Sequence, residues 1–260
     1  MKLKNTASAL GLYKYECNKP GNTAFSFFYS NIIEILTSWQ VSPTYIGAEG
    51  IGYSGKLTKV GGRTQGRLLQ SSFEHISVLL IVANPFQSDS PAYDHFISAS
   101  LSYDESNQEL IMSFVANEAF VPLDSLRFKE AIASLIHVST WDFGYGFSTL
   151  LEKQPEFHIL GLDTGKLSTE EYNSLCSWYA TPGPARVNVL RDVYPYNILN
   201  EKQLALRVEN GITLREFIER QECCSLTRIS TSDLYLWMVP PAEIGSFRKV
   251  LSSSNLLLSH

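Results

Sequence analysis

The segment that comes nearest to a phosphate-binding motif is residues 50–57, which read GIGYSGKL. It matches the GxGxxG pattern of dinucleotide sites, but Leu57 stands where a P-loop needs the serine or threonine that binds magnesium. A phosphate cradle also needs a helix that begins directly after the glycines, whereas Gly61 and Gly62 follow within a few residues and would break it. We therefore interpret this stretch as a glycine-rich turn or loop.

The histidines, cysteines and serines also lack the spacing of known catalytic or metal sites. The five histidines form no HxH, HxxxH or HExxH pattern. The four cysteines, Cys17, Cys176, Cys223 and Cys224, have no CxxC spacing, and we expect the side chains of the adjacent pair to point apart. No GxSxG nucleophile elbow is present. The sequence therefore predicts no catalytic residues, no metal site and no cofactor.

Charge is distributed unevenly along the chain. The 260 residues carry a formal net charge of −5, whereas a nucleic-acid-binding surface needs a basic excess. Residues 84–130 hold two Lys/Arg against eight Asp/Glu. Exposed carboxylates beside hairpin turns would present a negative surface to a basic partner, although a solvated face that serves only solubility has the same composition. This acidic segment includes Asp89, Asp94, Asp104, Glu105, Glu109, Glu118 and Asp124.

The overall composition is that of a globular protein, with 44% hydrophobic and 18% charged residues. The longest apolar run, residues 78–83, is far shorter than the roughly 20 residues that cross a bilayer. The apolar stretch near the N-terminus, residues 7–13, is too short for a signal peptide. We expect a cytoplasmic protein that contacts neither membrane nor nucleic acid directly.

Residues 1–140 have the pattern of an α+β unit. Apolar residues at spacings of three and four predict helices over residues 24–39 and 124–138. Three other segments are rich in β-branched, aromatic and leucine residues, which favours strands. These predicted strands are residues 73–83, 96–103 and 109–115. The glycine-rich residues 44–66, between the first predicted helix and the first predicted strand, are predicted as loop.

Residues 141–260 predict a second α+β half that resembles a split βαβ sandwich. Capping boxes predict the starts of three helices, at Ser168 with Glu171, Asn200 with Gln203, and Thr213 with Glu216. The predicted strands are residues 187–190, 226–229, 234–239 and 256–258, with a helix from Pro241 to about Ser252. The predicted fold class is therefore α+β, with two packed halves that each place helices on one face of an antiparallel sheet.

Two short runs are interpreted as structural. The aromatic and glycine run at residues 141–147 is typical of a tight, packed crossover between the halves. In the second run Asp192 is expected to pair with Arg191 or to accept local backbone amides at a strand-to-helix junction. The structural residues of the two runs are Trp141, Gly144, Tyr145, Gly146, Phe147, Arg191, Asp192, Tyr194, Pro195 and Asn197.

Residues 190–199, LRDVYPYNIL, begin a region that resembles a known class of proteins. Together with LWMV at residues 236–239 and the leucines at 256–258, they resemble the C-terminal half of bacterial toxin-immunity proteins of the immunity protein 52 type, associated with type VI secretion effectors. The resemblance reaches back to about residue 141 and does not cover residues 1–140. It implies a non-catalytic α+β protein that binds a cognate toxin in the cytosol and occludes its active site.

An acidic inhibitor suits a toxin with a basic cleft, such as a nuclease, because complementary charge speeds encounter and fixes orientation. The expected toxin-binding residues are Asp89, Tyr93, Asp94, Tyr103, Asp104, Glu105 and Glu109, with the tyrosines as anchors. Two alternatives remain open. One is a hydrolase or transferase whose active site is assembled from dispersed residues, and the other is a housekeeping scaffold. The lack of a compact catalytic motif disfavours the first, and the acidic segment disfavours the second.

Overall fold

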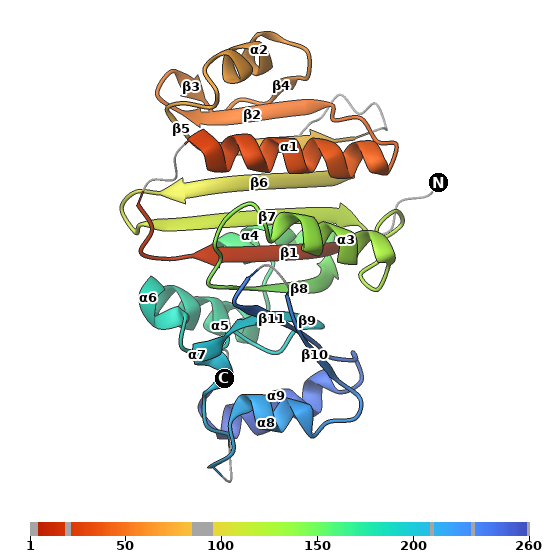
Figure 1. Cartoon of the computed structure of the whole chain (residues 1–260), viewed down its shortest axis with the longest axis vertical. Helices are drawn as coiled ribbons and strands as arrows, with labels where there is room; N and C mark the ends of the chain where they lie inside the picture. The colour runs from red at the N-terminus through yellow and green to blue at the C-terminus, as the bar shows by residue number, and fades with distance from the viewer. Residues whose placement is uncertain (1–4, 19–21, 85–95, 209–210, 230–231, 259–260) are drawn as a thin grey trace.

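A computed structural model describes residues 5–18, 22–84, 96–208, 211–229 and 232–258. Its strands form one antiparallel sheet in the order β10-β11-β9-β8-β1-β7-β6-β5-β2-β3, with β4 paired to β2 (Figure 1). The strands are β1 Thr6–Lys14, β2 Tyr45–Gly50, β3 Tyr53–Ser54, β4 Thr58–Lys59, β5 Ile76–Ala83, β6 Ile97–Asp104, β7 Glu109–Asn117, β8 Phe143–Leu150, β9 Tyr196–Asn200, β10 Ser225–Arg228 and β11 Leu234–Met238.

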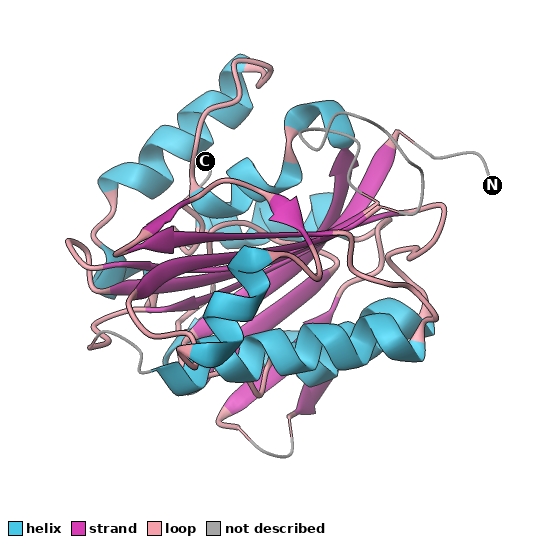
Figure 2. Ribbon diagram, turned by 90° about the horizontal axis from the view of Figure 1, so that it is seen from above, coloured by secondary structure: helices cyan, strands magenta, loops and turns pink. Residues whose placement is uncertain are grey.

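Helices lie on both faces of this sheet (Figure 2). They are α1 Asn22–Ser38, α2 Arg63–Gln70, α3 Leu126–Leu135, α4 Pro155–Leu160, α5 Thr169–Ala180, α6 Gly183–Arg186, α7 Glu201–Leu204, α8 Leu214–Glu219 and α9 Ile244–Ser253, with a 3-10 turn η1 at Leu151–Lys153. The mixture of helices and antiparallel strands confirms the predicted α+β class.

The side chains of the central strand β1 explain why helices pack on both faces of the sheet. Successive side chains of a strand point to opposite faces, and here both sets are apolar. Leu10 and Leu12 join the core under α1 and α3, whereas Ala9 and Tyr13 join a second core under α4 and α5. The expectation of helices on one face only is therefore wrong for the middle of the sheet, because β1 is apolar on both sides.

The expectation of a separate sheet in each half is also corrected. Residues 141–147 were predicted as a crossover, but Phe143–Leu150 forms β8, which pairs with β1 along its whole length. Glycine makes this pairing possible, because a Cβ at Gly144 would come within 2.5 Å of the carbonyl oxygen of Gly11. The sheet therefore runs across the boundary at residue 141. Whether residues 1–140 and 141–260 fold as separate domains stays a prediction.

The local predictions in the second half have mixed outcomes. All three capping boxes are present, at the starts of α5, α7 and α8. The strands predicted at residues 187–190 and 256–258 are reduced to one parallel bridge between Leu190 and Leu257. The strand β9 was missed, because Pro195 directly before it indicates a turn. In the first half, the predicted loop at residues 44–66 contains β2 and the start of α2.

Candidate binding site

The acidic segment is divided by the fold into buried and exposed parts. Tyr103 and Glu109, expected as exposed contacts, are only 7% and 8% exposed. The Tyr103 hydroxyl donates to the carbonyl oxygen of Cys17 at 3.2 Å, and the Glu109 carboxylate pairs with Arg186 at 3.4 Å. Burial raises the pKa of Glu109, while Arg186 acts against that rise. Both residues are thus corrected to interior positions.

The exposed part of the segment that lies nearest to them is the turn between β6 and β7. Asp104 and Glu105 are both exposed there. One Asp104 oxygen accepts from the backbone NH of Ser106 at 2.8 Å, and the other accepts from the Asn107 amide at 2.7 Å. Asp104 therefore stabilises the turn while its charge still faces solvent. The other expected contacts, Asp89, Tyr93 and Asp94, lie outside the described residues.

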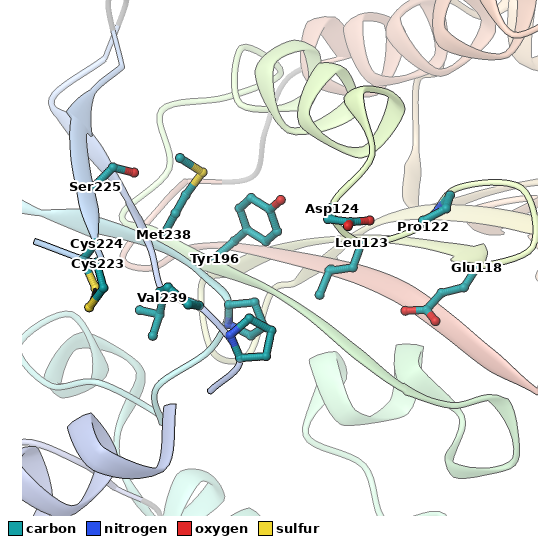
Figure 3. Close-up of a pocket in the computed structure, with 13 residues that line it drawn as sticks. Glu118, Pro122, Leu123, Asp124, Tyr196, Cys223, Cys224, Ser225, Met238 and Val239 are labelled. Atoms are coloured by element: carbon teal, nitrogen blue, oxygen red, sulfur yellow. Dashed lines mark hydrogen bonds between the residues drawn. The ribbon is translucent and has the colours of Figure 1, made fainter. Parts of the chain in front are cut away.

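Two further carboxylates of the segment, those of Glu118 and Asp124, line a cavity of about 570 Å³ at the opposite end of β7 (Figure 3). The cavity lies between the loop before α3 and the β10–β11 hairpin. Its lining residues are Glu118, Pro122, Leu123, Asp124, Pro195, Tyr196, Cys223, Cys224, Ser225, Met238, Val239, Pro240 and Pro241. The two carboxylates are visible in the sequence as part of the acidic segment, but the cavity is not, because most of its other lining residues come from residues 195–241.

The start of α3 holds Asp124 at the edge of this cavity. Ser125 is the N-cap residue of α3, and its hydroxyl oxygen accepts from the backbone NH of Phe128 at 3.3 Å. The same hydroxyl donates to the carbonyl oxygen of Pro122 at 2.6 Å. These bonds fix the backbone on both sides of Asp124. Its carboxylate therefore projects from a rigid helix start rather than from a free loop.

Tyr196 of β9 and Met238 of β11 are paired across the two strands, and their side chains lie next to each other in the lining of the cavity (Figure 3). The Tyr196 ring packs edge-on against Phe128 of α3, with 5.5 Å between ring centroids, so its position is fixed by the core. Burial raises the pKa of the Tyr196 hydroxyl, and the negative charge of Asp124 adds to the rise. The tyrosine is therefore neutral at physiological pH and offers an aromatic surface beside a carboxylate.

The electrostatic character of the cavity follows from its lining. Glu118 and Asp124 are its charged residues, and both are acidic. Glu118 also accepts a hydrogen bond from the Thr6 hydroxyl at 2.7 Å, which orients its carboxylate. The remaining lining is largely apolar side chains and proline rings. Such a site favours a cation on an apolar stem, as a lysine or arginine side chain presents.

Some of the residues predicted as structural, among them Tyr145, Phe147 and Tyr194, belong to a buried aromatic network on the other face of the sheet. The Arg191 guanidinium donates to the Tyr145 hydroxyl and, at 2.8 Å, to the carbonyl oxygen of His158. The Tyr145 ring stacks on Tyr194 at 4.3 Å between centroids, and its hydroxyl lies 2.5 Å from that of Tyr13. Every one of these contacts is made inside the protein. The structural role of the network is a prediction that they support.

Several other members of the two runs also make internal contacts. Trp141 donates from its indole nitrogen to the carbonyl oxygen of Leu135, and the Asn197 side chain bonds to both backbone polar groups of Tyr194. Phe147 packs against the His158 ring with 4.9 Å between centroids. A Cβ at Gly146 would come within 3.1 Å of the Phe128 ring. Pro195 differs from these residues, since it lines the acidic cavity.

Asp192 has a different charged partner from the one expected. Its carboxylate accepts two hydrogen bonds from Arg248, at 2.6 and 2.7 Å, rather than pairing with Arg191. The other half of the expectation is confirmed, because Asp192 also accepts from the backbone NH of Val193 at 2.7 Å. Arg191 is directed away into the aromatic network.

His158 is a buried histidine that packs against this aromatic network, and its pKa is strongly altered. Burial lowers its pKa well below the ordinary 6.5, and the positive charges of Arg191 and Lys153 lower it further. Its Nε2 lies 3.2 Å from the Tyr194 hydroxyl. The imidazole is therefore neutral near pH 7, as expected for a ring packed into an apolar surrounding.

The described part of the chain offers neither a metal-binding cluster nor a membrane-spanning helix. No group of three or more His, Cys, Asp or Glu side chains gathers there in a way that would hold a metal ion. Within the same residues, no helix has the length and hydropathy needed to cross a bilayer. One expectation is corrected: the thiols of Cys223 and Cys224 do not point apart, since their sulfur atoms lie 3.8 Å from each other.

Comparison with known proteins gives one informative similarity. No protein-family model matches the sequence, and no curated protein matches it. Among solved structures, the Pseudomonas aeruginosa T6SS protein PA0821 is similar, with a TM-score of 0.59 over 90% of this chain and 68% of that chain. The two sequences are 12% identical. What the two proteins share is the fold.

Proposed function

We propose that the protein binds a basic bacterial toxin delivered by type VI secretion and neutralises it, as an immunity protein does. The observation that carries the proposal is the cavity at Tyr196, whose charged lining residues are Glu118 and Asp124. The fold shared with a T6SS protein supports the setting, and residues 190–199 resemble immunity proteins. Catalysis has no part in the proposal, which requires only an occupied surface.

The cavity suits one lysine or arginine side chain of the toxin. The alkyl stem would pack on Leu123 and Met238, while the charged end would meet the carboxylates of Glu118 and Asp124. A guanidinium over the Tyr196 ring would add a cation–π contribution of about 0.5–2 kcal/mol. Basic side chains line the active-site clefts of enzymes that act on anionic substrates. Sequestering such a side chain would remove it from catalysis.

The turn at Asp104 and Glu105 has a separate part in this proposal. It lies at the other end of β7, a strand of nine residues, which places it about 30 Å from Glu118. At this distance the two acidic surfaces cannot contact the same side chain. Exposed charges at the turn would instead attract the basic toxin and raise its association rate. The cavity would then determine how long the complex lasts.

The proposal predicts that a gene beside this one encodes a secreted toxin, and that toxin is the ligand for the binding assay. The double variant Glu118→Lys, Asp124→Lys should weaken toxin binding by roughly tenfold or more and abolish protection of cells that express the toxin. Glu219→Lys, at an exposed position on α8, is the matched control and should keep both. A folded double variant that binds like the unmodified protein would disprove the role of the cavity. A toxin that the unmodified protein does not bind would disprove the function.

A further inference from the structure

Cys223 and Cys224 lie together in the wall of the acidic cavity, directly before β10 (Figure 3). Their sulfur atoms are 3.8 Å apart. Cys223 is exposed and Cys224 is partly buried. A small reagent that enters the cavity therefore meets one accessible thiol with a second thiol within reach of it.

We propose that this pair is a modification site that exchanges with a low-molecular-weight disulfide of the glutathione type and closes to an intramolecular disulfide between Cys223 and Cys224. In the first step the Cys223 thiolate attacks one sulfur of the reagent, whose S–S bond breaks, and the released thiolate takes up the proton that Cys223 lost. In the second step the Cys224 sulfur attacks Cys223 Sγ and displaces the other reagent thiol, which takes the Cys224 proton. The two cysteines are oxidised by two electrons, and the reagent is reduced to two thiols.

The order of the two steps follows from the surroundings of each thiol. Exposure makes Cys223 the sulfur that meets the reagent first. Burial raises the pKa of the Cys224 thiol to about 11, the nearby Cys223 thiol adds to the rise, and the Trp237 side chain acts against it. Cys224 is therefore the resolving thiol. Since the thiolate is the attacking form, the second step should speed up about tenfold per pH unit below that pKa.

The geometry of adjacent cysteines makes the product easy to reverse. Consecutive Cα atoms are about 3.8 Å apart, whereas most disulfides join Cα atoms separated by roughly 4.4–6.8 Å. A bridge between neighbours is therefore strained, and strained disulfides are readily reduced. The pair thus suits a reversible modification rather than a permanent structural crosslink.

The modification would act on the wall of the cavity. Ser225, the next residue, begins β10 and pairs with Met238, which lines the cavity. Closing a ring at residues 223 and 224 constrains the backbone at this first pair, so occupancy of the cavity should respond to oxidation. This consequence rests on the proposed function, whereas the covalent chemistry does not.

The test uses the full chain with Cys17→Ser and Cys176→Ser, which leaves the adjacent pair as its thiols. After incubation with oxidised glutathione at pH 8, intact mass should show the loss of two hydrogens and no retained glutathione, reversed by dithiothreitol. Adding Cys224→Ser should trap one glutathione on Cys223. Adding Cys223→Ser instead should slow the first reaction at least about tenfold, because the remaining thiol is partly buried and poorly ionised. Matching thermal midpoints would show that the variants are folded.

Two outcomes would overturn the proposal. One is a stable glutathione adduct when both cysteines are present, and the other is a disulfide-linked dimer in place of the internal bridge. Toxin binding is measured separately on the reduced and oxidised forms. If the bridge forms but binding is equal in both forms, only the effect on the cavity is wrong. If the reduced protein binds no toxin, the proposed function fails while the mass result stands.

Discussion

Arg248 of α9 holds both carboxylate oxygens of Asp192, with its Nε 2.6 Å from one oxygen and its Nη2 2.7 Å from the other. The Asp192 side chain is only 18% exposed and that of Arg248 37%. A two-point contact between charged groups is stronger and more directional than a single hydrogen bond. It fixes the segment after Leu190 to the helix that closes the C-terminal core.

The first prediction concerns this ion pair. Asp192→Ala should lower the free energy of unfolding by roughly 1–3 kcal/mol, because Arg248 and the backbone NH of Val193 lose their acceptor. Urea denaturation measures the change. Arg248→Ala should have a comparable effect, and the double variant should cost less than the sum of the two. Additive effects would show that the pair contributes little.

The second prediction concerns the close approach of β8 to β1. Gly144→Ala should destabilise the protein by roughly 1–3 kcal/mol or more, because the added Cβ would meet the Gly11 carbonyl oxygen and the Leu12 side chain. Gly66→Ala is the matched control on α2, where a Cβ would meet no atom within 4 Å. It should stabilise the protein by about 0.4–1 kcal/mol. Thermal unfolding of both variants measures the contrast.

The third prediction concerns pH. The folded-state pKa of His158 lies below the ordinary 6.5, so below about pH 6.5 the unfolded state binds more protons at this residue than the folded state. This group therefore stabilises the protein fully above pH 6.5 and loses its contribution as pH falls, by up to about 1.4 kcal/mol per pH unit. Urea denaturation of the unmodified protein and His158→Gln between pH 5 and 8 isolates the effect. Parallel pH curves would contradict it.

The fourth prediction separates the two acidic surfaces by kinetics. Asp104→Lys with Glu105→Lys should lower the association rate of a basic toxin and weaken its salt dependence, while changing stability by no more than about 0.5 kcal/mol. Asp124→Lys alone should mainly raise the dissociation rate, because it acts inside the cavity. Surface plasmon resonance at low and high salt measures both rates. Unchanged association with the turn variant would show that the turn serves solubility alone.

Features set by neighbours in the sequence could be predicted. The capping box of Ser168 and Glu171 needs only residues three positions apart, and the apolar spacing of α1 is equally local. Glu109 shows the limit. Its charge and its place after a polar turn indicate exposure. The side chain is instead buried, where it pairs with Arg186, a residue 77 positions later in the sequence.

The candidate site shows the same limit. Glu118 and Asp124 are visible in the sequence as part of an acidic segment, but nothing local indicates that Tyr196 and Met238 complete a cavity around them. Tyr196 and Met238 lie next to each other because β9 pairs with β11, a contact between residues about 40 positions apart. The adjacent thiols are similar, because their backbone geometry and not their spacing brings the sulfur atoms to 3.8 Å.

The central position of β1 has a consequence for how the chain can be made. Ala7 pairs with Asn117 of β7 on one side and with Thr149 of β8 on the other. Both partner strands follow β1 by more than 90 residues, so they are synthesised well after it. During translation both edges of β1 stay open, and long-range pairing of this kind is slow. A nascent chain stopped at residue 140 would still present one open edge, and open edges recruit strands from other chains. Pairing with β8 closes that edge, so a chain that lacks residues 143–150 should aggregate more readily than one that includes them.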